Sequence, residues 1–147
     1  MIRPILTHPD PRLRETAVPV ATVDDYVRTL LADLFDTLYD SGGIGLAATQ
    51  VGVARRIVVI DLGSPGHRQP YACINPTILK AKGAVRSQEG CLSVPGQTTT
   101  VPRAKSVEVS FLDAQGRPCK LRAQGLLAAC FQHEIDHLDG RLLIDPR

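Results

Sequence analysis

The sequence has no apolar run near the 20 or so residues that a membrane-spanning helix needs. Its first stretch, MIRPILTHPDPRLR, is broken by prolines and charges and lacks the apolar core of a secretion signal. Charge is nearly balanced, with 17 Lys and Arg against 15 Asp and Glu, a formal charge of +2, and no basic run occurs. We therefore expect a cytoplasmic protein with no membrane association and no nucleic-acid binding of its own.

The sequence also lacks internal repeats, low-complexity segments and cysteine pairs at CxxC spacing. Its four cysteines are Cys73, Cys91, Cys119 and Cys130. In a reducing compartment, such cysteines are predicted to be buried thiols or metal ligands rather than disulfides. A chain of 147 residues with 44% hydrophobic and 22% charged residues is predicted to form a single domain over residues 1–147 that needs no disulfide to bury its core.

The apolar pattern predicts two helices and several strands. The first helix begins in the segment 22–25 and ends near Gly42, with apolar residues at helical spacing between these points. The second covers 125–138, with an apolar side made of Leu126, Leu127, Cys130, Phe131 and Ile135. Strands are expected at 56–61, 71–75, 77–87, 106–112 and 117–123, with a hairpin connection at 113–116 and an extended or turn-like segment at 1–20. These elements indicate an α+β fold with mostly antiparallel sheets packed around a central C-terminal helix, and one N-terminal amphipathic helix.

The second helix carries the sequence His133-Glu134-Ile135-Asp136-His137. Two histidines four residues apart lie on one face of a helix, so both imidazoles can reach a single metal ion. Glu134 projects beside that face and can serve as a general base. The alternative is a solvated helix face with two incidental histidines. Because the rest of the helix is apolar, its polar groups are expected to be buried, and buried polar groups need partners such as a metal.

A catalytic metal site of this type needs a third protein ligand. The candidates are Cys91, Cys130, Cys73, Cys119, His8, His67 and several carboxylates. Cys130 precedes His137 by seven residues, roughly 10 Å along a helix, so the two cannot easily bind one ion. Cys91 follows Gly90 between two expected strands and could complete the set, but spacing alone leaves the choice open.

A third segment, Gly43-Ile-Gly-Leu-Ala-Ala-Thr-Gln50, places one polar side chain after a run of small and apolar residues. It lacks both the GxGxxG pattern and a Walker lysine, so phosphate binding is not supported. The segment can be a loop followed by a strand or helix in which small residues serve packing. Gln50 could alternatively donate a hydrogen bond to a developing oxyanion.

Together these segments resemble the bacterial peptide deformylase family. That family carries a GxGxAAxQ segment, an EGCxS segment and a helix written HEIDH or HEMDH, in this order. The chain has Gly43–Gln50, Glu89-Gly-Cys-Leu-Ser93 and Gln132–His137. Smaller matches occur at His8–Arg14, Ile74–Pro76 and Val101–Arg103, so the resemblance spans nearly the whole chain.

The resemblance implies removal of the formyl group from N-formylmethionine at the start of nascent polypeptides, with release of formate. It implies one divalent ion, Fe(II) in the cell, which Ni, Co or Zn can replace, in a monomeric enzyme. By match, the metal ligands are Cys91, His133 and His137, Glu134 is the general base and acid, and Gln50 and the backbone N–H of Leu92 are oxyanion donors. The peptide backbone would contact Ile44, Gly45 and Gly90, and the methionine pocket would involve Ile44, Leu126, Ala129, Cys130 and the His133 ring.

Several positions depart from the family pattern. Many members have an arginine where this chain has Gln97-Thr-Thr-Thr100, and Ser87 and Ala129 stand where bulkier apolar residues are common. The chain ends at Arg147, whereas better-known members continue into a helix that helps them dock on the ribosome, so we expect only a transient, weakened ribosome contact. Glu89 and Arg103 are expected to form an ion pair that holds the Cys91 segment.

Two other functions are compatible with parts of the sequence. A general HExxH metallopeptidase would take its third ligand downstream of the helix, where Asp139 and Asp145 are the candidates. A non-catalytic metal-binding or peptide-binding relative would not need Glu134 as a base.

Overall fold

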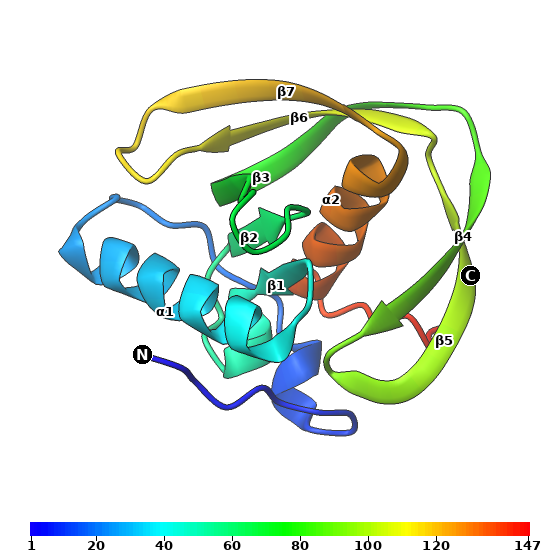
Figure 1. The fold of residues 1–147 in the computed structure, drawn as a ribbon, viewed down its shortest axis with the longest axis horizontal. Helices are drawn as coiled ribbons and strands as arrows, with labels where there is room; N and C mark the ends of the chain where they lie inside the picture. The colour runs from blue at the N-terminus through cyan, green and yellow to red at the C-terminus, as the bar shows by residue number, and fades with distance from the viewer.

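Two α-helices and two antiparallel sheets make up the computed structural model, which describes residues 1–147 (Figure 1). The helices are α1 (Asp25–Ser41) and α2 (Gly125–Leu138), and two short 3-10 helices are η1 (Pro11–Arg14) and η2 (Ala48–Val51). The strands are β1 (Gly45–Ala47), β2 (Ile57–Asp61), β3 (Pro70–Lys82), β4 (Val85–Cys91), β5 (Val94–Arg103), β6 (Ser106–Leu112) and β7 (Pro118–Gln124). The predicted α+β fold class is confirmed.

The main sheet has five strands in the order β1-β2-β3-β6-β7, and β4 and β5 form a separate hairpin. In Figure 1, α2 lies in the centre of the molecule, below β6 and β7 and beside the β4–β5 hairpin. Its buried residues join one hydrophobic cluster with the inner face of the sheet, including Phe131 of the helix and Val109 of β6. The helix that carries the two histidines is therefore held on several sides by the sheet.

Strand β2 is buried along its whole length because it separates the two helices. Val58 and Ile60 belong to the cluster around α2, whereas Ile57 and Val59 belong to the cluster around α1. A continuous β-branched run is what a strand covered on both faces requires. The short strand β1 pairs with β2 and lies at the edge of the sheet, so it carries residues 45–47 toward α2.

Helix α1 has the predicted ends. The side chain of Asp24 accepts a hydrogen bond from the backbone N–H of Val27 at 3.0 Å, which caps the first turn. Gly42 follows the last helical residue with a φ of 74°, a conformation that favours glycine. The predicted bounds of α2 and the hairpin connection between β6 and β7 are confirmed as well.

Two local predictions were wrong, and one strand was not predicted. The expected strands 71–75 and 77–87 are instead one strand, β3, which ends before Gly83, and β4, which starts after it. Strand β5 was not predicted because its prolines weaken the strand pattern, yet it pairs on one side only, where proline is tolerated. The segment 1–20 is extended or turn-like as predicted, apart from the 3-10 helix η1, which Asp10 caps. Leu126, expected on the apolar side of α2, has 61% of its surface exposed.

No helix of the structure combines the length and the apolar character that crossing a membrane would take.

Candidate active site

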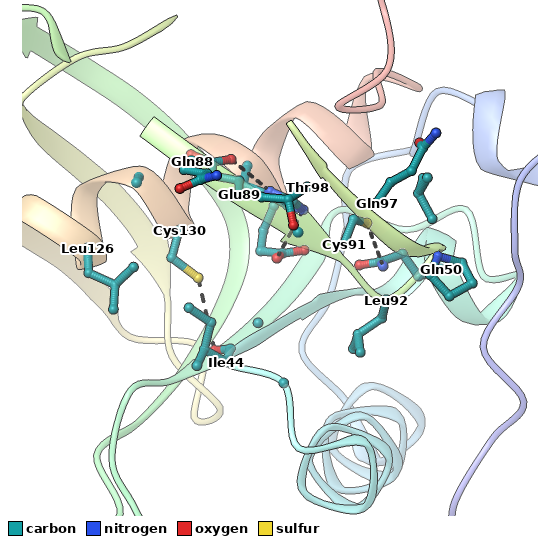
Figure 2. A pocket seen from close by; sticks show the side chains of 18 of the residues that line it. Ile44, Gln50, Gln88, Glu89, Cys91, Leu92, Gln97, Thr98, Leu126 and Cys130 are labelled. Atoms are coloured by element: carbon teal, nitrogen blue, oxygen red, sulfur yellow. Dashed lines mark hydrogen bonds and ion pairs between the residues drawn. The ribbon is translucent and has the colours of Figure 1, made fainter. Parts of the chain in front are cut away.

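A cavity of about 680 Å³ lies between α2, the segment leading into β1, and the β4–β5 hairpin. Helix α2 contributes His133 and Glu134 to its lining, β4 contributes Cys91, and η2 contributes Gln50. Figure 2 shows Cys91 and Gln50 on one side of this cavity and Ile44, Cys130 and Leu126 on the other. Segments far apart in the sequence therefore meet at one place.

Three potential metal donors meet at the floor of the site. The Nε2 atom of His137 lies 3.3 Å from the Sγ of Cys91 and 3.3 Å from the Nε2 of His133. Four-coordinate ligands at 2.0–2.3 Å from one ion stand about 3.3–3.7 Å apart, so these separations fit a shared ion. The ligand atoms of all three residues lie within 4.8 Å of one another. The thiol and two imidazoles suit a borderline-soft divalent metal.

The two imidazoles lie in different electrostatic surroundings. Burial lowers the pKa of His133, but the carboxylate of Glu134 and its contacts with Cys91 and Glu89 outweigh burial and raise the pKa to about 10. Such a concentration of negative charge also favours a divalent cation. Burial and the nearby charge of His133 lower the pKa of His137 to about 3, so its ring is neutral at pH 7 and has a lone pair for a ligand.

Glu134 is buried beside the two histidines. Burial raises the pKa of its carboxyl to about 7, and its Oε1 atom has no hydrogen-bond partner in the protein. A carboxyl with a pKa near 7 can both accept and return a proton at neutral pH. The backbone of Gly45 approaches closely, because a Cβ there would stand 2.7 Å from Oε2 of Glu134.

Gln50 is fixed at both ends of its amide. Its Oε1 accepts a hydrogen bond from the backbone N–H of Ala47 at 2.9 Å, and its Nε2 donates to Ser93 Oγ at 3.0 Å. The same Nε2 lies 3.8 Å from the Sγ of Cys91, so the amide nitrogen is placed beside the donor cluster. Ser93 was not predicted to have a role at the site, although it stands only two residues after Cys91 in the sequence.

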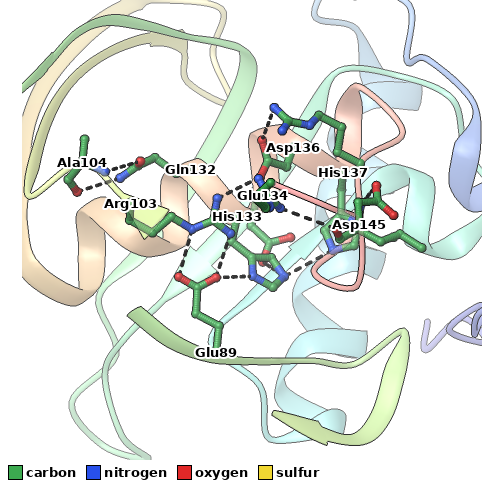
Figure 3. Close-up of polar contacts among 12 residues, drawn as sticks. Glu89, Arg103, Ala104, Gln132, His133, Glu134, Asp136, His137 and Asp145 are labelled. Atoms are coloured by element: carbon green, nitrogen blue, oxygen red, sulfur yellow. Dashed lines mark hydrogen bonds and ion pairs between the residues drawn. The ribbon is translucent and has the colours of Figure 1, made fainter. Parts of the chain in front are cut away.

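A largely buried network of ion pairs contacts His133 at its Nδ1 atom (Figure 3). Arg103 donates to both oxygens of Glu89, at 3.0 and 2.8 Å, which confirms the predicted ion pair. Oε1 of Glu89 also lies 3.0 Å from Nδ1 of His133, and these contacts outweigh burial and lower the pKa of Glu89 to about 2. Arg103 also donates to Asp136 at 2.8 Å. Asp136 lies within the HEIDH segment, but the sequence alone assigned it no partner.

The residues expected to contact substrate all line the cavity: Ile44, Gly45, Gly90, Leu126, Ala129 and Cys130. Cys130 points toward the carbonyl oxygen of Ile44, 4.0 Å away, and burial raises the pKa of its thiol. Leu92 and Thr98 line the cavity too, whereas Ser87 does not. Neither Cys130 nor the remaining cysteines belong to the donor cluster.

Comparison with known proteins places this arrangement in a family. A sequence model described as polypeptide deformylase matches residues 2–147. The chain belongs to the polypeptide deformylase family. It is 57% identical over 141 residues to a peptide deformylase of Alkalilimnicola ehrlichii, a match that covers 96% of the chain and 79% of that relative.

Solved deformylase structures share the fold. A peptide deformylase crystal structure from Legionella pneumophila is 48% identical with a TM-score of 0.95, covering 99% of this chain and 85% of that one. The Ehrlichia chaffeensis peptide deformylase, solved in complex with actinonin, is 41% identical with a TM-score of 0.92, covering 97% of this chain and 86% of that one.

The two downstream carboxylates that a general metallopeptidase would use have other partners. Asp139 accepts a hydrogen bond from Arg56 at 2.9 Å, and Asp145 accepts two from Arg14 at 2.7 and 2.8 Å. Cys91 is the third donor that the fold brings to the histidines.

Proposed function

We propose that this deformylase-family chain is a metal-dependent hydrolase that removes the formyl group from N-formylmethionine at the start of nascent polypeptides and releases formate. The observation that carries the proposal is the meeting of a Cys/His/His donor cluster, a buried carboxyl and an amide donor at one cavity. A protein that only stores metal or binds peptide has no use for a buried carboxyl whose pKa is near 7.

Cys91, His133 and His137 would hold one divalent ion, which we infer to be Fe(II) in the cell and replaceable by Ni, Co or Zn. When bound, the ion supplies Lewis acidity and a nucleophilic water at neutral pH. The neutral ring of His137 is ready to be a ligand, and Glu89 fixes the ring of His133 through Nδ1.

Glu134 accepts the proton of the attacking water and returns it to the departing amine. The reaction then yields formate and a free amino terminus. As negative charge develops on the formyl oxygen, the amide of Gln50 and the backbone N–H of Leu92 donate hydrogen bonds to it. One such donor typically contributes about 3–4 kcal/mol.

The peptide is held in an extended pose by Ile44, Gly45 and Gly90, and its methionine side chain packs against Leu126, Ala129 and Cys130. Gly45 brings the backbone so close to Glu134 that little room is left near the carboxyl. Crowding of this kind admits a formyl hydrogen and disfavours bulkier acyl groups.

We further propose that residues 1–147 act as a single catalytic domain, that the protein is a monomer in the cytoplasm, and that its contact with the ribosome is transient. These proposals follow from the family resemblance rather than from the geometry of the site.

The test is formate release from a formyl-Met-Ala peptide by protein purified without oxygen and loaded with Fe(II) or Ni(II). The unformylated and N-acetyl peptides are the controls. Release from the formyl peptide alone supports the proposal. Cleavage of the unformylated peptide would instead support a general metallopeptidase, and no release by a folded, metal-loaded protein would support a relative that only binds.

A further inference from the structure

All four lysines of the chain lie on or beside β3, β6 and β7, which are neighbours in the main sheet. Lys80 and Lys82 are on β3 and Lys120 is on β7, while Lys105 precedes β6 and bonds through its backbone N–H to the carbonyl of Lys82. All four are exposed, and none forms an ion pair.

The strand register places three of these lysines, Lys80, Lys82 and Lys120, on one face of the sheet together with Arg122. Lys80 pairs with Glu108, which pairs with Arg122, and Lys82 pairs with Ser106 in the next row. Alternate residues of β6, such as Val107 and Val109, are buried against α2. Glu108 and its partners Lys80 and Arg122 therefore face away from α2. They lie on the outer side of β3, β6 and β7, which run along the top of Figure 1.

This outer face carries a clear excess of positive charge. Glu108 is the one acidic residue among the paired rows, and it stands 4.0 Å from Arg122, whose side chain is 85% exposed. A small pocket of about 180 Å³ lies among these strands, lined in part by Lys80, Lys82 and Arg122. We call Lys80, Lys82, Lys120 and Arg122 the lysine face.

We propose that the lysine face binds the phosphate backbone of double-helical RNA. Exposed cations bind phosphates without reading sequence. Single-stranded RNA is bound through stacking on aromatic side chains, and the one exposed aromatic residue of the chain is Tyr26 on α1. The choice of RNA rests on the proposed function, because nascent polypeptides are made on a particle rich in folded RNA.

The proposal departs from the expectation that the chain has no nucleic-acid binding of its own. That expectation rested on the small net charge and on the absence of a basic run. Successive side chains of a strand point to opposite faces of the sheet, so residues two apart share a face. Cations at this spacing, on two strands that are distant in the sequence, form no basic run but lie on one surface after folding.

The test measures binding of a short fluorescent RNA duplex by anisotropy, over a salt range of about 50–200 mM. Each phosphate contact contributes about −0.9 to the slope of log K against log salt. We expect the double variant Lys80→Gln with Arg122→Gln to reduce the magnitude of the slope by about 2 and to weaken binding at least tenfold at about 50 mM salt.

The matched control is the double variant Arg28→Gln with Arg55→Gln, which removes the same charge from exposed positions on α1 and before β2. It should bind RNA like the parent. An equal loss of RNA affinity in the control would overturn the proposal and indicate an effect of net charge. The proposal would also be overturned if the parent did not bind RNA at low salt. Binding to vesicles of phosphatidylcholine and phosphatidylglycerol without binding to RNA would overturn it as well.

Formate release from the short formyl peptide is measured in the same variants. It should be unchanged, because the lysine face lies outside the catalytic cavity. RNA binding without formate release by the parent would contradict the proposed function and leave the lysine face supported. Formate release without RNA binding would overturn only the proposal that the lysine face binds RNA.

Discussion

The Oε1 atom of Glu89 lies 3.0 Å from the Nδ1 atom of His133, although 44 residues separate them. The same carboxylate receives two hydrogen bonds from Arg103. A carboxylate held in this way fixes the orientation of the imidazole and leaves Nε2 directed toward Cys91 and His137. The β4–β5 hairpin, which carries both Glu89 and Arg103, thus sets the geometry of a helix residue.

Replacing Arg103 tests this support. Arg103→Ala leaves the largely buried carboxylate of Glu89 without its cation, whereas Asp136 keeps its contacts with Arg147 and Arg141. We expect the free energy of unfolding to fall by about 3–5 kcal/mol and the metal affinity to fall with it. Arg103→Lys keeps the charge but loses the two-pronged contact, so its losses should be smaller. Urea unfolding measures the change in stability, and metal titration measures the change in metal affinity. Unchanged metal affinity and activity in Arg103→Ala would contradict the supporting role.

The two cysteines at the cavity should behave differently. Cys91→Ala removes one of three donors, and we expect metal affinity to drop more than about 100-fold, since loss of an outer partner alone costs 10–100-fold. Cys130→Ala should keep the metal, because its thiol faces the carbonyl of Ile44 instead. Metal content after dialysis against a weak chelator distinguishes them. Equal loss in both variants would contradict the assignment of Cys91.

Glu134→Ala should retain the metal and lose turnover. The variant removes the group assigned to proton transfer, which typically accounts for about 10²–10⁴-fold in rate. The measurement is kcat for formate release, together with metal content. Asp139→Asn, a change at an exposed carboxylate paired with Arg56, is a suitable control and should keep its rate. A Glu134→Ala enzyme with near-normal kcat would rule out the base assignment.

Gly45→Ala tests how close the backbone comes to the general base. The added Cβ would stand 2.7 Å from Glu134 Oε2 and 2.8 Å from Cys130 Sγ, so one of these groups must move. We expect kcat to fall at least about tenfold, with a stability loss of about 1–3 kcal/mol. At Gly90 the added Cβ would stand 3.7 Å from the nearest atom, the carbonyl oxygen of Gln97. Gly90→Ala should therefore reduce kcat and stability less than Gly45→Ala does. The reverse order of the two losses would contradict this geometry.

Alkaline pH should weaken a contact outside the active site. Tyr39 donates to Asp61 at 2.7 Å, and burial together with this carboxylate raises the pKa of Tyr39 to about 12. Because the folded pKa lies above the ordinary value of 10, the contact stabilises the fold fully below pH 10 and loses this effect as pH rises toward 12.

Urea unfolding of Tyr39→Phe checks this assignment. The variant should be less stable than the parent by about 1 kcal/mol at pH 8, and the difference should shrink above pH 10. A difference that stays constant from pH 8 to pH 11.5 would show that Tyr39 ionises no later in the folded protein than in the unfolded chain.

The sequence by itself determined the elements whose residues act locally. The spacing of His133 and His137 puts both imidazoles on one helix face, the Asp24 cap and Gly42 bound α1, and the β-branched run of β2 encodes burial on both faces. These features depend on periodicity and capping within a few residues. They can therefore be predicted from the sequence without the tertiary contacts.

Only the tertiary structure decided which distant residues meet. Spacing left the third donor open between Cys91 and other residues, and pairing of β4 with the unpredicted strand β5 brought Cys91 to His137. Register across β3, β6 and β7 likewise gathered Lys80 and Arg122 on one face. Both outcomes depend on contacts between residues far apart in the chain, and no local pattern specifies which strands pair or in what register.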